Sequence, residues 1–419
     1  MSASELPLRR AYRGRILTPL DAGGPLRFLD DGLLIVEDGR IVSVAPFDRA
    51  DFVGPSLDLH PRLLLPGFID THVHFPQTRV IGRASGPLLD WLERTVFPEE
   101  ARFREEPYAR AVAAELCARL LAAGTTTSSI FSSSSPLATE LLFQALADAG
   151  LRAFAGLTLM DQACPPELRL GKREALAACE RLIFRWHGHD AGRLAFAVTP
   201  RFALSCSRPL LEGAARLAAG HRLLMQTHIA ENPAEGHAVL ASHPWGEDYL
   251  GVYEKTGLLE SRALLAHAIH LSPREWDRVA LHKASIAHCP DSNFFLGSGR
   301  MRLAEARSRG VTVGLGSDVA AGRSFDLRRA MASAYDNALC VEQPLTPDEL
   351  VSMATLEGAR ALGLDAVTGS LEPGKEADFI ALGLPDYLED REAILGQLAF
   401  GDAGRVERVF VRGRLLFSA

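Results

Sequence analysis

Short apolar runs of the kind that form β-strands lie at both ends of the chain. Two of the N-terminal runs are separated by Asp38-Gly39, and Asp-Gly between apolar runs is a strong hairpin signal. The two ends therefore predict one small sheet domain built from both termini. Its candidate strands are residues 12–17, 32–37, 40–44, 377–382 and 408–417.

Between these ends, strand-like runs alternate with longer segments that carry a helical period. Eight strands with intervening helices over roughly 300 residues predict a parallel (β/α)8 TIM-like barrel. A doubly wound open sheet is the structural alternative, but it more often begins with a glycine-rich phosphate loop, which the chain lacks. The predicted strands are 63–74, 124–130, 152–160, 193–201, 222–230, 263–270, 285–289 and 312–317, and the clearest helices are 109–122, 173–187, 209–219 and 272–282.

Metal-binding residue types gather at the ends of the predicted barrel strands. His72 and His74 end the first strand and share one face, because side chains alternate along a strand. Later strands end in His228, His267 and Asp318. Barrel enzymes place their chemistry at these carboxyl ends. Four imidazoles and one carboxylate suit Zn²⁺, with Fe²⁺ as the common substitute.

The composition narrows the class of partner and the compartment. Apolar residues make up 47% and charged residues 23% of the 419 positions, and the formal net charge is −7 with no basic run. We therefore expect no nucleic-acid or membrane partner. The N-terminus carries no apolar signal segment, which favours a cytoplasmic protein. Reduced thiols are expected because no CxxC pair occurs among Cys117, Cys164, Cys179, Cys206, Cys289 and Cys340.

Taken together, these motifs resemble the amidohydrolase superfamily of metal-dependent hydrolases. In that superfamily a β/α barrel carries a small β-sandwich formed by both termini. The resemblance covers almost the whole chain, and the predicted boundaries are 1–64 and 373–419 for the sandwich and 65–372 for the barrel. Within the superfamily, four segments resemble the guanine deaminases: HVHFPQT at 72–78, WLERTVFP at 91–98, PRF at 200–202 and HIAEN at 228–232.

The reactive groups have roles that their chemistry suggests. A water molecule on the metal becomes a usable nucleophile near neutral pH, because the cation stabilises hydroxide. Asp318, a metal neighbour, can take the proton of that water. Glu231 follows His228 by three residues and can carry a proton to a purine ring nitrogen and then to the leaving ammonia. The resemblance adds His267 to the catalytic set as a ligand.

Substrate choice is assigned to less reactive residues. Guanine presents an oxygen acceptor at its six-position, where adenine presents an amino donor. Arg201 is a permanently charged donor, so it would attract the first and repel the second. Gln77 can read the nitrogen edge of the ring, and Phe202 can stack on its face. Trp91 could do the same, although ordinary core packing is nearly as good an explanation for both aromatics.

Other histidines are given no ligand role. In a strand, His270 and His267 face opposite sides, and the resemblance places the ligand at His267. His288 belongs to a His-Cys-Pro turn and is expected to line the pocket at most. Surface positions are expected for His187, His189, His237 and His243.

Three alternatives differ in how they use this barrel. Binuclear relatives bridge two metals with a carboxylated lysine, but strand 193–201 contains no lysine, so one metal is expected. Another aminohydrolase of the superfamily, acting on pterins, triazines, cytosine or adenosine-type compounds, would share every ligand. A catalytically silent scaffold predicts a broken ligand set, and none of the five ligands is missing. The deaminases with His-x-Glu and Pro-Cys-x-x-Cys are excluded because neither half of that signature occurs.

The resemblance implies one activity, hydrolysis of guanine to xanthine and ammonia in purine salvage or catabolism. It implies one Zn²⁺ per subunit, with Fe²⁺ possible, a small purine and water as the partners, and a homodimer.

Overall fold

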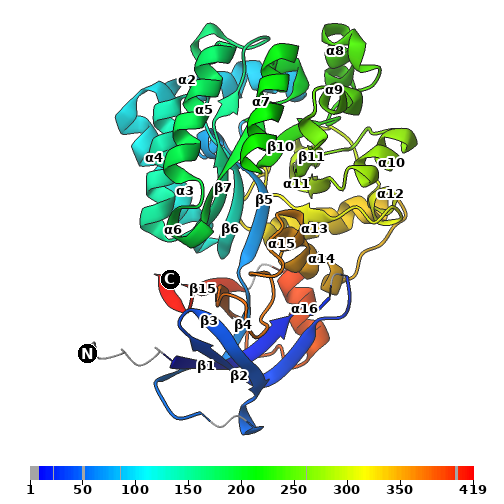
Figure 1. The fold of residues 1–419 in the computed structure, drawn as a ribbon. Helices are drawn as coiled ribbons and strands as arrows, with labels where there is room; N and C mark the ends of the chain where they lie inside the picture. Colours follow the sequence, from blue (N-terminus) through cyan, green and yellow to red (C-terminus); the bar gives the residue numbers. More distant parts are fainter. Residues whose placement is uncertain (1–8, 22, 50–51, 85, 261, 402–403) are drawn as a thin grey trace, which may run out of the picture.

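The computed structural model describes residues 9–21, 23–49, 52–84, 86–260, 262–401 and 404–419 (Figure 1). The N-terminal segment, for which no targeting signal is predicted, lies largely outside these residues. Figure 1 shows a large body of strands and helices above a smaller sheet, which combines strands from the first and the last part of the described chain. The fold is the predicted α/β class.

The smaller body is a seven-stranded sheet in the order β16-β15-β14-β4-β1-β2-β3. β4 lies at the junction of the two ends, because it pairs in parallel with β1 and antiparallel with the C-terminal strand β14. The Asp-Gly turn joins β2 and β3 as an antiparallel hairpin, as predicted. The strands are β1 (Arg9–Thr18), β2 (Arg27–Glu37), β3 (Arg40–Pro46), β4 (Ser56–Pro66), β14 (Phe379–Gly383), β15 (Arg405–Val411) and β16 (Arg414–Ser418).

The larger body is a barrel of eight parallel strands. The backbone N–H of Asp318 donates to the carbonyl of His72 at 2.8 Å, and His74 donates to Val319 at 3.3 Å, so the last strand meets the first. The predicted barrel is thereby confirmed. The strands are β5 (Phe68–His74), β6 (Thr125–Phe131), β7 (Arg152–Gly156), β9 (Leu194–Pro200), β10 (Leu224–Ile229), β11 (Ala263–His267), β12 (Ser285–His288) and β13 (Val313–Leu315), and β8 (Thr158–Leu159) pairs with β9.

Helices follow the barrel strands and cover them (Figure 1). The α-helices are α1 (Leu88–Trp91), α2 (Phe97–Ala101), α3 (Glu106–Ala122), α4 (Pro136–Ala149), α5 (Lys172–Trp186), α6 (His189–Gly192), α7 (Arg208–His221), α8 (Pro233–Ser242), α9 (Tyr249–Lys255), α10 (Pro273–Leu281), α11 (Pro290–Phe295), α12 (Leu303–Arg307), α13 (Leu327–Cys340), α14 (Pro347–Met353), α15 (Leu356–Ala361) and α16 (Arg391–Phe400). The short helical turns are η1 (Phe47–Arg49), η2 (Phe75–Gln77), η3 (Leu92–Val96), η4 (Arg102–Arg104), η5 (Pro166–Leu168), η6 (Ala203–Ser205), η7 (Pro244–Gly246) and η8 (Leu258–Glu260).

The predicted strand 63–74 is two strands that belong to different sheets. β4 ends at Pro66 in the terminal sheet, and β5 begins at Phe68 in the barrel. Between them, Gly67 lies so close to Thr126 that a Cβ atom there would be 2.2 Å from the Thr126 hydroxyl oxygen. Glycine is therefore required where the chain passes from one sheet to the other.

Local sequence fixes where several helices begin after the strands. Asn232 and Ser272 each form a capping box with a glutamate three residues later, and a proline follows each cap at the first helical position. These signals satisfy the free N–H groups of the first turn and end the preceding loop at a defined residue. The loop after β10 is consequently only a few residues long.

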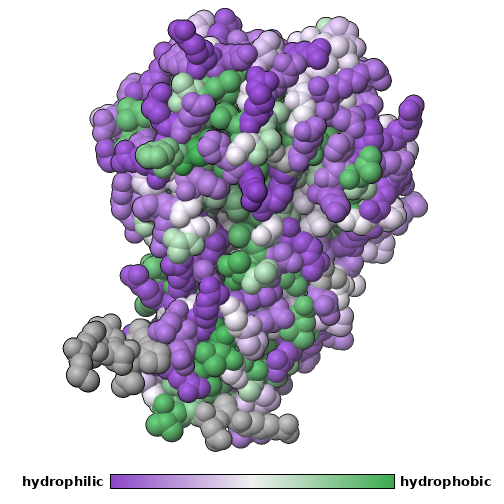
Figure 2. Space-filling view, viewed as in Figure 1, coloured by the Kyte–Doolittle hydropathy of each residue, from purple (hydrophilic) through white to green (hydrophobic). Residues whose placement is uncertain are grey.

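The barrel strands β5, β6, β7 and β9 are buried along their whole length, as expected for a parallel sheet covered on both faces. On the visible face of the molecule, hydrophilic side chains dominate and hydrophobic ones show in small separate areas (Figure 2). Among the described residues, no helix has the length and apolar character needed to cross a membrane.

Candidate active site

The first barrel strand delivers two imidazoles to one point. His72 and His74 alternate along β5, and their Nε2 atoms lie 3.1 Å apart. Phe131, at the end of β6, packs against both rings with centroid distances of 4.8 and 4.9 Å. This phenylalanine fills the space beside the rings and restricts the orientations that they can adopt.

Two further imidazoles come from the ends of β10 and β11. The Nε2 atom of His228 lies 3.2 Å from that of His74. His267 ends β11 in the left-handed region, with φ of 71°. A non-glycine residue there costs about 1–3 kcal/mol, and such strain collects at functional sites. The strained backbone turns the His267 ring toward the other three.

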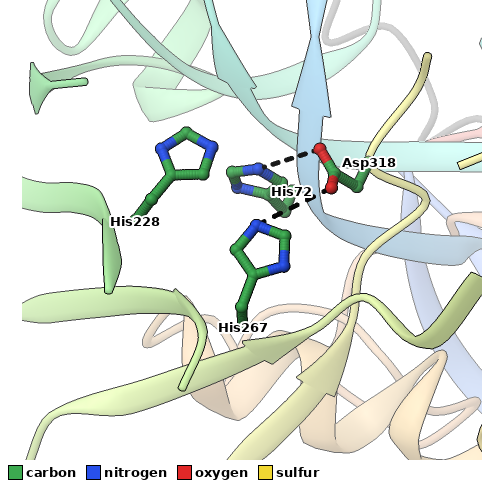
Figure 3. Close-up of side chains that lie close together, drawn as sticks. All are labelled: His72, His228, His267 and Asp318. Carbon is green, nitrogen blue, oxygen red and sulfur yellow. Dashed lines mark ion pairs between the residues drawn. The ribbon is translucent and has the colours of Figure 1, made fainter. Parts of the chain in front are cut away.

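Asp318 completes the group from the segment after β13. One carboxylate oxygen lies 3.3 Å from Nε2 of both His72 and His74, and the other lies 3.7 Å from Nε2 of His267. Figure 3 shows His72, His228 and His267 around this carboxylate, with dashed lines to the first and last. Asp318 also has a left-handed backbone, with φ of 47°.

This group fits a metal ion. The ligand atoms of His72, His228, His267 and Asp318 all lie within 4.8 Å of one another, and His74 lies in hydrogen-bonding range of three of them. Nitrogens bound at about 2.0–2.1 Å to one zinc ion are separated by about 2.9–3.4 Å. The Nε2 atom of His267 is buried and has no hydrogen-bond partner among the described residues. A shared cation would account for this unpaired atom and for the close approach of the nitrogens.

The environment keeps two of these rings neutral, as metal ligands must be. Burial lowers the pKa of His74 to about 3. Burial, followed by the neighbouring imidazoles, lowers the pKa of His228 well below its ordinary value. Their nitrogen lone pairs are therefore available near neutral pH.

The opposite ring nitrogens are held by residues that the sequence did not single out for this role. Nδ1 of His228 lies 2.6 Å from the backbone carbonyl of Arg201, and Nδ1 of His267 lies 2.9 Å from Oδ1 of Asn293. A carbonyl only accepts, so each Nδ1 carries the proton and each Nε2 offers its lone pair. These contacts fix the tautomer and aim the rings.

Asp70 is a third supporting residue that the sequence reasoning missed. Its carboxylate accepts hydrogen bonds from the N–H of His72 at 3.1 Å and from the N–H of Ser317 at 2.9 Å. Burial raises its pKa to about 6, against the hydrogen bonds from Ser317. Asp70 thus ties the first strand to the segment that presents Asp318. Its position two residues before His72, on the same strand face, was the available signal.

Glu231 lies directly before the cap of α8 and points into the cluster. One oxygen lies 3.4 Å from Nε2 of His267, and the other accepts a hydrogen bond from Ser298 at 3.0 Å. Burial and then the charge of Asp318 raise the pKa of Glu231 to about 8, against the Ser298 hydrogen bond. A carboxyl group with such a pKa can give and take a proton near neutral pH.

A pocket of about 400 Å³, counted with its mouth, adjoins the cluster. Gln77, Arg201, Phe202 and Trp91 line it together with Glu231, so the structure gathers all the predicted substrate-facing residues. Trp91 contributes a wall, because its indole N–H already donates to Arg83 at 2.8 Å. Leu88, Leu92 and Leu296 supply apolar walls that the sequence did not point to.

Arg201 does not stand alone in this pocket. Its Nη1 lies 2.6 Å from Oε2 of Glu100, and both side chains are buried. The sequence shows the positive charge of Arg201, and the structure adds the Glu100 carboxylate beside it. Glu100 was missed because it lies 101 positions away in the chain.

The remaining histidines have other surroundings. His270 bonds the carbonyl of Ser298 at 2.7 Å, since β11 already ends at His267 and the predicted strand 263–270 is too long. His288 is buried outside the cluster, and burial lowers its pKa to about 3. The surface position expected for His243 is wrong, because its ring is buried and bonds the carbonyl of Ala203 at 2.9 Å.

A β/α barrel with four imidazoles and one carboxylate at its strand ends defines the class of metal-dependent barrel hydrolases. The chain belongs to the Amidohydrolase family, whose model matches residues 63–416.

Comparison with known proteins shows which members of this family the chain is similar to. The chain is 35% identical to the guanine deaminase of Escherichia coli K12 over 95% of this chain and 94% of that protein. It is 38% identical to a probable guanine deaminase of Deinococcus radiodurans, over 98% and 99% of the two chains. Its fold matches the crystal structure of guanine deaminase from C. acetobutylicum with bound guanine, with a TM-score of 0.91, 30% identity and coverage of 98% and 100%.

Proposed function

We propose that the chain is a guanine aminohydrolase, which converts guanine and water to xanthine and ammonia. One observation carries this proposal: the four-histidine, one-aspartate cluster adjoins a pocket that is also lined by Gln77 and Arg201. The cluster supplies hydrolysis, and the two polar side chains match the hydrogen-bonding edge of guanine. The similarity to guanine deaminases over nearly the whole chain supports the same substrate.

His72, His74, His228, His267 and Asp318 would hold one metal ion, Zn²⁺ or Fe²⁺. When bound, the metal supplies a strong positive charge that acidifies a water molecule at neutral pH. A single ion is favoured because β9 offers no lysine to bridge a second one. Metal analysis of the purified protein tests both the identity and the stoichiometry.

The chain's own residues move the protons. Asp318, within 3.3 Å of two imidazoles, takes a proton from the water that attacks the carbon bearing the amino group. Glu231 carries a proton to the neighbouring ring nitrogen and then to the departing amino group. Its raised pKa near 8 keeps a proton available for that transfer.

Arg201 and Gln77 orient the purine, and Phe202 covers its face. The N–H groups of Arg201 donate to the six-position oxygen of guanine, whereas adenine would place an amino donor against them. Leu88, Trp91, Leu92 and Leu296 surround the ring with apolar surface. The burial of these groups excludes bulk water, which strengthens each polar contact.

An ammonia-release assay on the purified protein tests the substrate. Guanine should be turned over, and adenine, cytosine, isoxanthopterin and 8-oxoguanine serve as rivals. Rapid turnover of one rival with none of guanine would contradict the guanine assignment and leave the hydrolase class intact. No turnover of any compound by the metal-loaded protein would favour the silent scaffold.

We also propose a cytoplasmic homodimer. All six cysteines are free in the structure, which suits a reducing compartment. The dimer rests on the family resemblance, and light scattering after size-exclusion chromatography tests it.

A further inference from the structure

Glu100 is a buried carboxylate that lies behind the side chains of the pocket wall. It lies on α2, and its side chain is only 1% exposed. One oxygen binds Arg201 at 2.6 Å, and the other accepts a longer hydrogen bond from Nε2 of Gln77 at 3.5 Å. A buried charge is tolerated only with such partners. Glu100 therefore contacts the two polar side chains proposed to recognise the purine, and it does not line the pocket itself.

The helix that carries Glu100 contacts the Arg201 guanidinium through a second side chain. Phe97, three residues earlier and on the same helix face, lies with its ring centroid 5.4 Å from the guanidinium carbon. Among the described residues, Glu100 is the sole hydrogen-bond acceptor for the Arg201 side chain. The other N–H groups of the guanidinium remain available to a ligand, and a planar guanidinium fixed at one nitrogen has its remaining donors aimed.

Gln77 is oriented by the same carboxylate. Glu100 can only accept a hydrogen bond, so the Gln77 amide nitrogen must face it. The Gln77 oxygen faces the backbone N–H of Ala320 at 3.2 Å, which can only donate. These two contacts select one of the two amide orientations. One N–H and one lone pair are left for a purine edge.

Glu100 also sets the charge of the pocket. Alone, a buried arginine would attract anions, and xanthine, the product of the proposed reaction, loses a ring proton more readily than guanine does. Paired with Glu100, Arg201 presents donors without a net charge. The pocket then favours a neutral ring over an anionic one.

We infer that Glu100 is a positioning residue for substrate recognition, which holds Arg201 and Gln77 in their reading orientations and cancels the charge that would retain an anionic product. This inference rests on the proposed function. It assigns a specificity role to a residue that touches neither the metal cluster nor the pocket surface.

The test compares the wild type with Glu100→Gln, Glu100→Asp and a matched control, Glu99→Gln. Glu99 is adjacent and buried but bonds Arg102 and Tyr108 instead. For each variant we would measure Tm, metal content, kcat and KM for guanine, and inhibition by xanthine at mildly acidic and mildly alkaline pH.

Glu100→Gln should raise KM for guanine about tenfold, with a smaller change in kcat and unchanged metal content. Xanthine should inhibit it more strongly relative to guanine, most of all at alkaline pH. Glu100→Asp shortens the side chain but keeps the charge, so its KM should rise while its relative inhibition by xanthine stays like the wild type. Glu99→Gln should resemble the wild type in both.

A KM within about twofold of the wild type in a folded, metal-loaded Glu100→Gln protein would overturn the inference. An equal rise in KM for Glu99→Gln would overturn it too, because a general structural effect would then explain the change. If Glu100→Gln folds poorly, Glu100→Asp is tested in its place, and a KM within about twofold of the wild type would again overturn the inference. Failure of the wild type to deaminate guanine would overturn the proposed function instead.

Discussion

Asn293 should control metal affinity without binding the metal. Its Oδ1 atom accepts the Nδ1 proton of His267 at 2.9 Å, and the side chain is 1% exposed. Asn293→Ala removes the group that fixes the tautomer and direction of the His267 ring. The ring could then rotate or carry its proton on Nε2, the atom that faces the cluster.

The size of the effect follows from this contact. Outer-shell partners of metal-bound histidines typically contribute 10- to 100-fold in affinity, which corresponds to about 1.4–2.7 kcal/mol. At a metal concentration well above both dissociation constants, the added stability on metal binding should fall by the same amount. Asn293→Asp keeps an acceptor and adds charge, so it should bind the metal at least as tightly as the wild type.

The assay is competition with a chromophoric chelator, combined with thermal unfolding in the presence and absence of Zn²⁺. Asn337→Ala is the matched control. Asn337 is also buried, and it donates to the carbonyl of Met301 at 2.8 Å from α13, which carries none of the cluster residues. Its loss should reduce stability and leave metal affinity unchanged. Equal metal affinities for the wild type, Asn293→Ala and Asn337→Ala would refute the orienting role.

Three other perturbations test the proton carrier, the metal and a buried carboxyl group outside the cluster. Glu231→Gln should keep its metal and lose about 10²- to 10⁴-fold in kcat, because a general acid and base is removed. Full activity with normal metal content would eliminate Glu231 as the proton carrier. Removal of the metal by a chelator should abolish ammonia release, and Zn²⁺ should restore it; activity that survives complete demetallation would contradict the hydrolytic mechanism. Burial raises the pKa of Glu357 from 4.5 to about 7, against the charges of Arg307 and Arg360. The carboxyl therefore favours the folded state fully below its unfolded pKa, and this contribution is lost as the pH rises through 7. Glu357→Gln should accordingly gain stability relative to the wild type between about pH 5 and 8, by about 2 kcal/mol in chemical unfolding, and a difference that is independent of pH would contradict the assignment.

The metal-binding cluster could be predicted from the sequence, because it follows from the alternation of side chains along a strand and from the positions of the strand ends. Alternation along β5 placed His72 and His74 together, and the rule that barrel strands end at one face added His228, His267 and Asp318. These relations depend only on which residues lie near the end of a strand. They tolerate errors of several residues in strand length, such as the predicted end of β11 at 270.

The supporting contacts had no comparable signal. The acceptor for His228 is a backbone carbonyl, which every residue possesses, so no side-chain pattern could indicate it. Asn293 and Glu100 reach their partners through the packing of helices whose relative positions are set by the whole barrel. The passage of the chain from one sheet to the other at Gly67 could not be predicted either, because an apolar run has the same pattern in both sheets.

Arg201 shows why one barrel can keep its metal chemistry while its substrate changes. Its main-chain carbonyl orients His228, whereas its side chain faces the pocket and pairs with Glu100. A substitution at this position replaces the guanidinium but leaves the carbonyl in place. A change of side chain at position 201 therefore leaves the tautomer of His228 unchanged, provided that β9 continues to end at the same residue. If the proposed recognition residues are right, substrate choice can vary through residues 77, 100 and 201, while the strand ends that hold the cluster stay fixed.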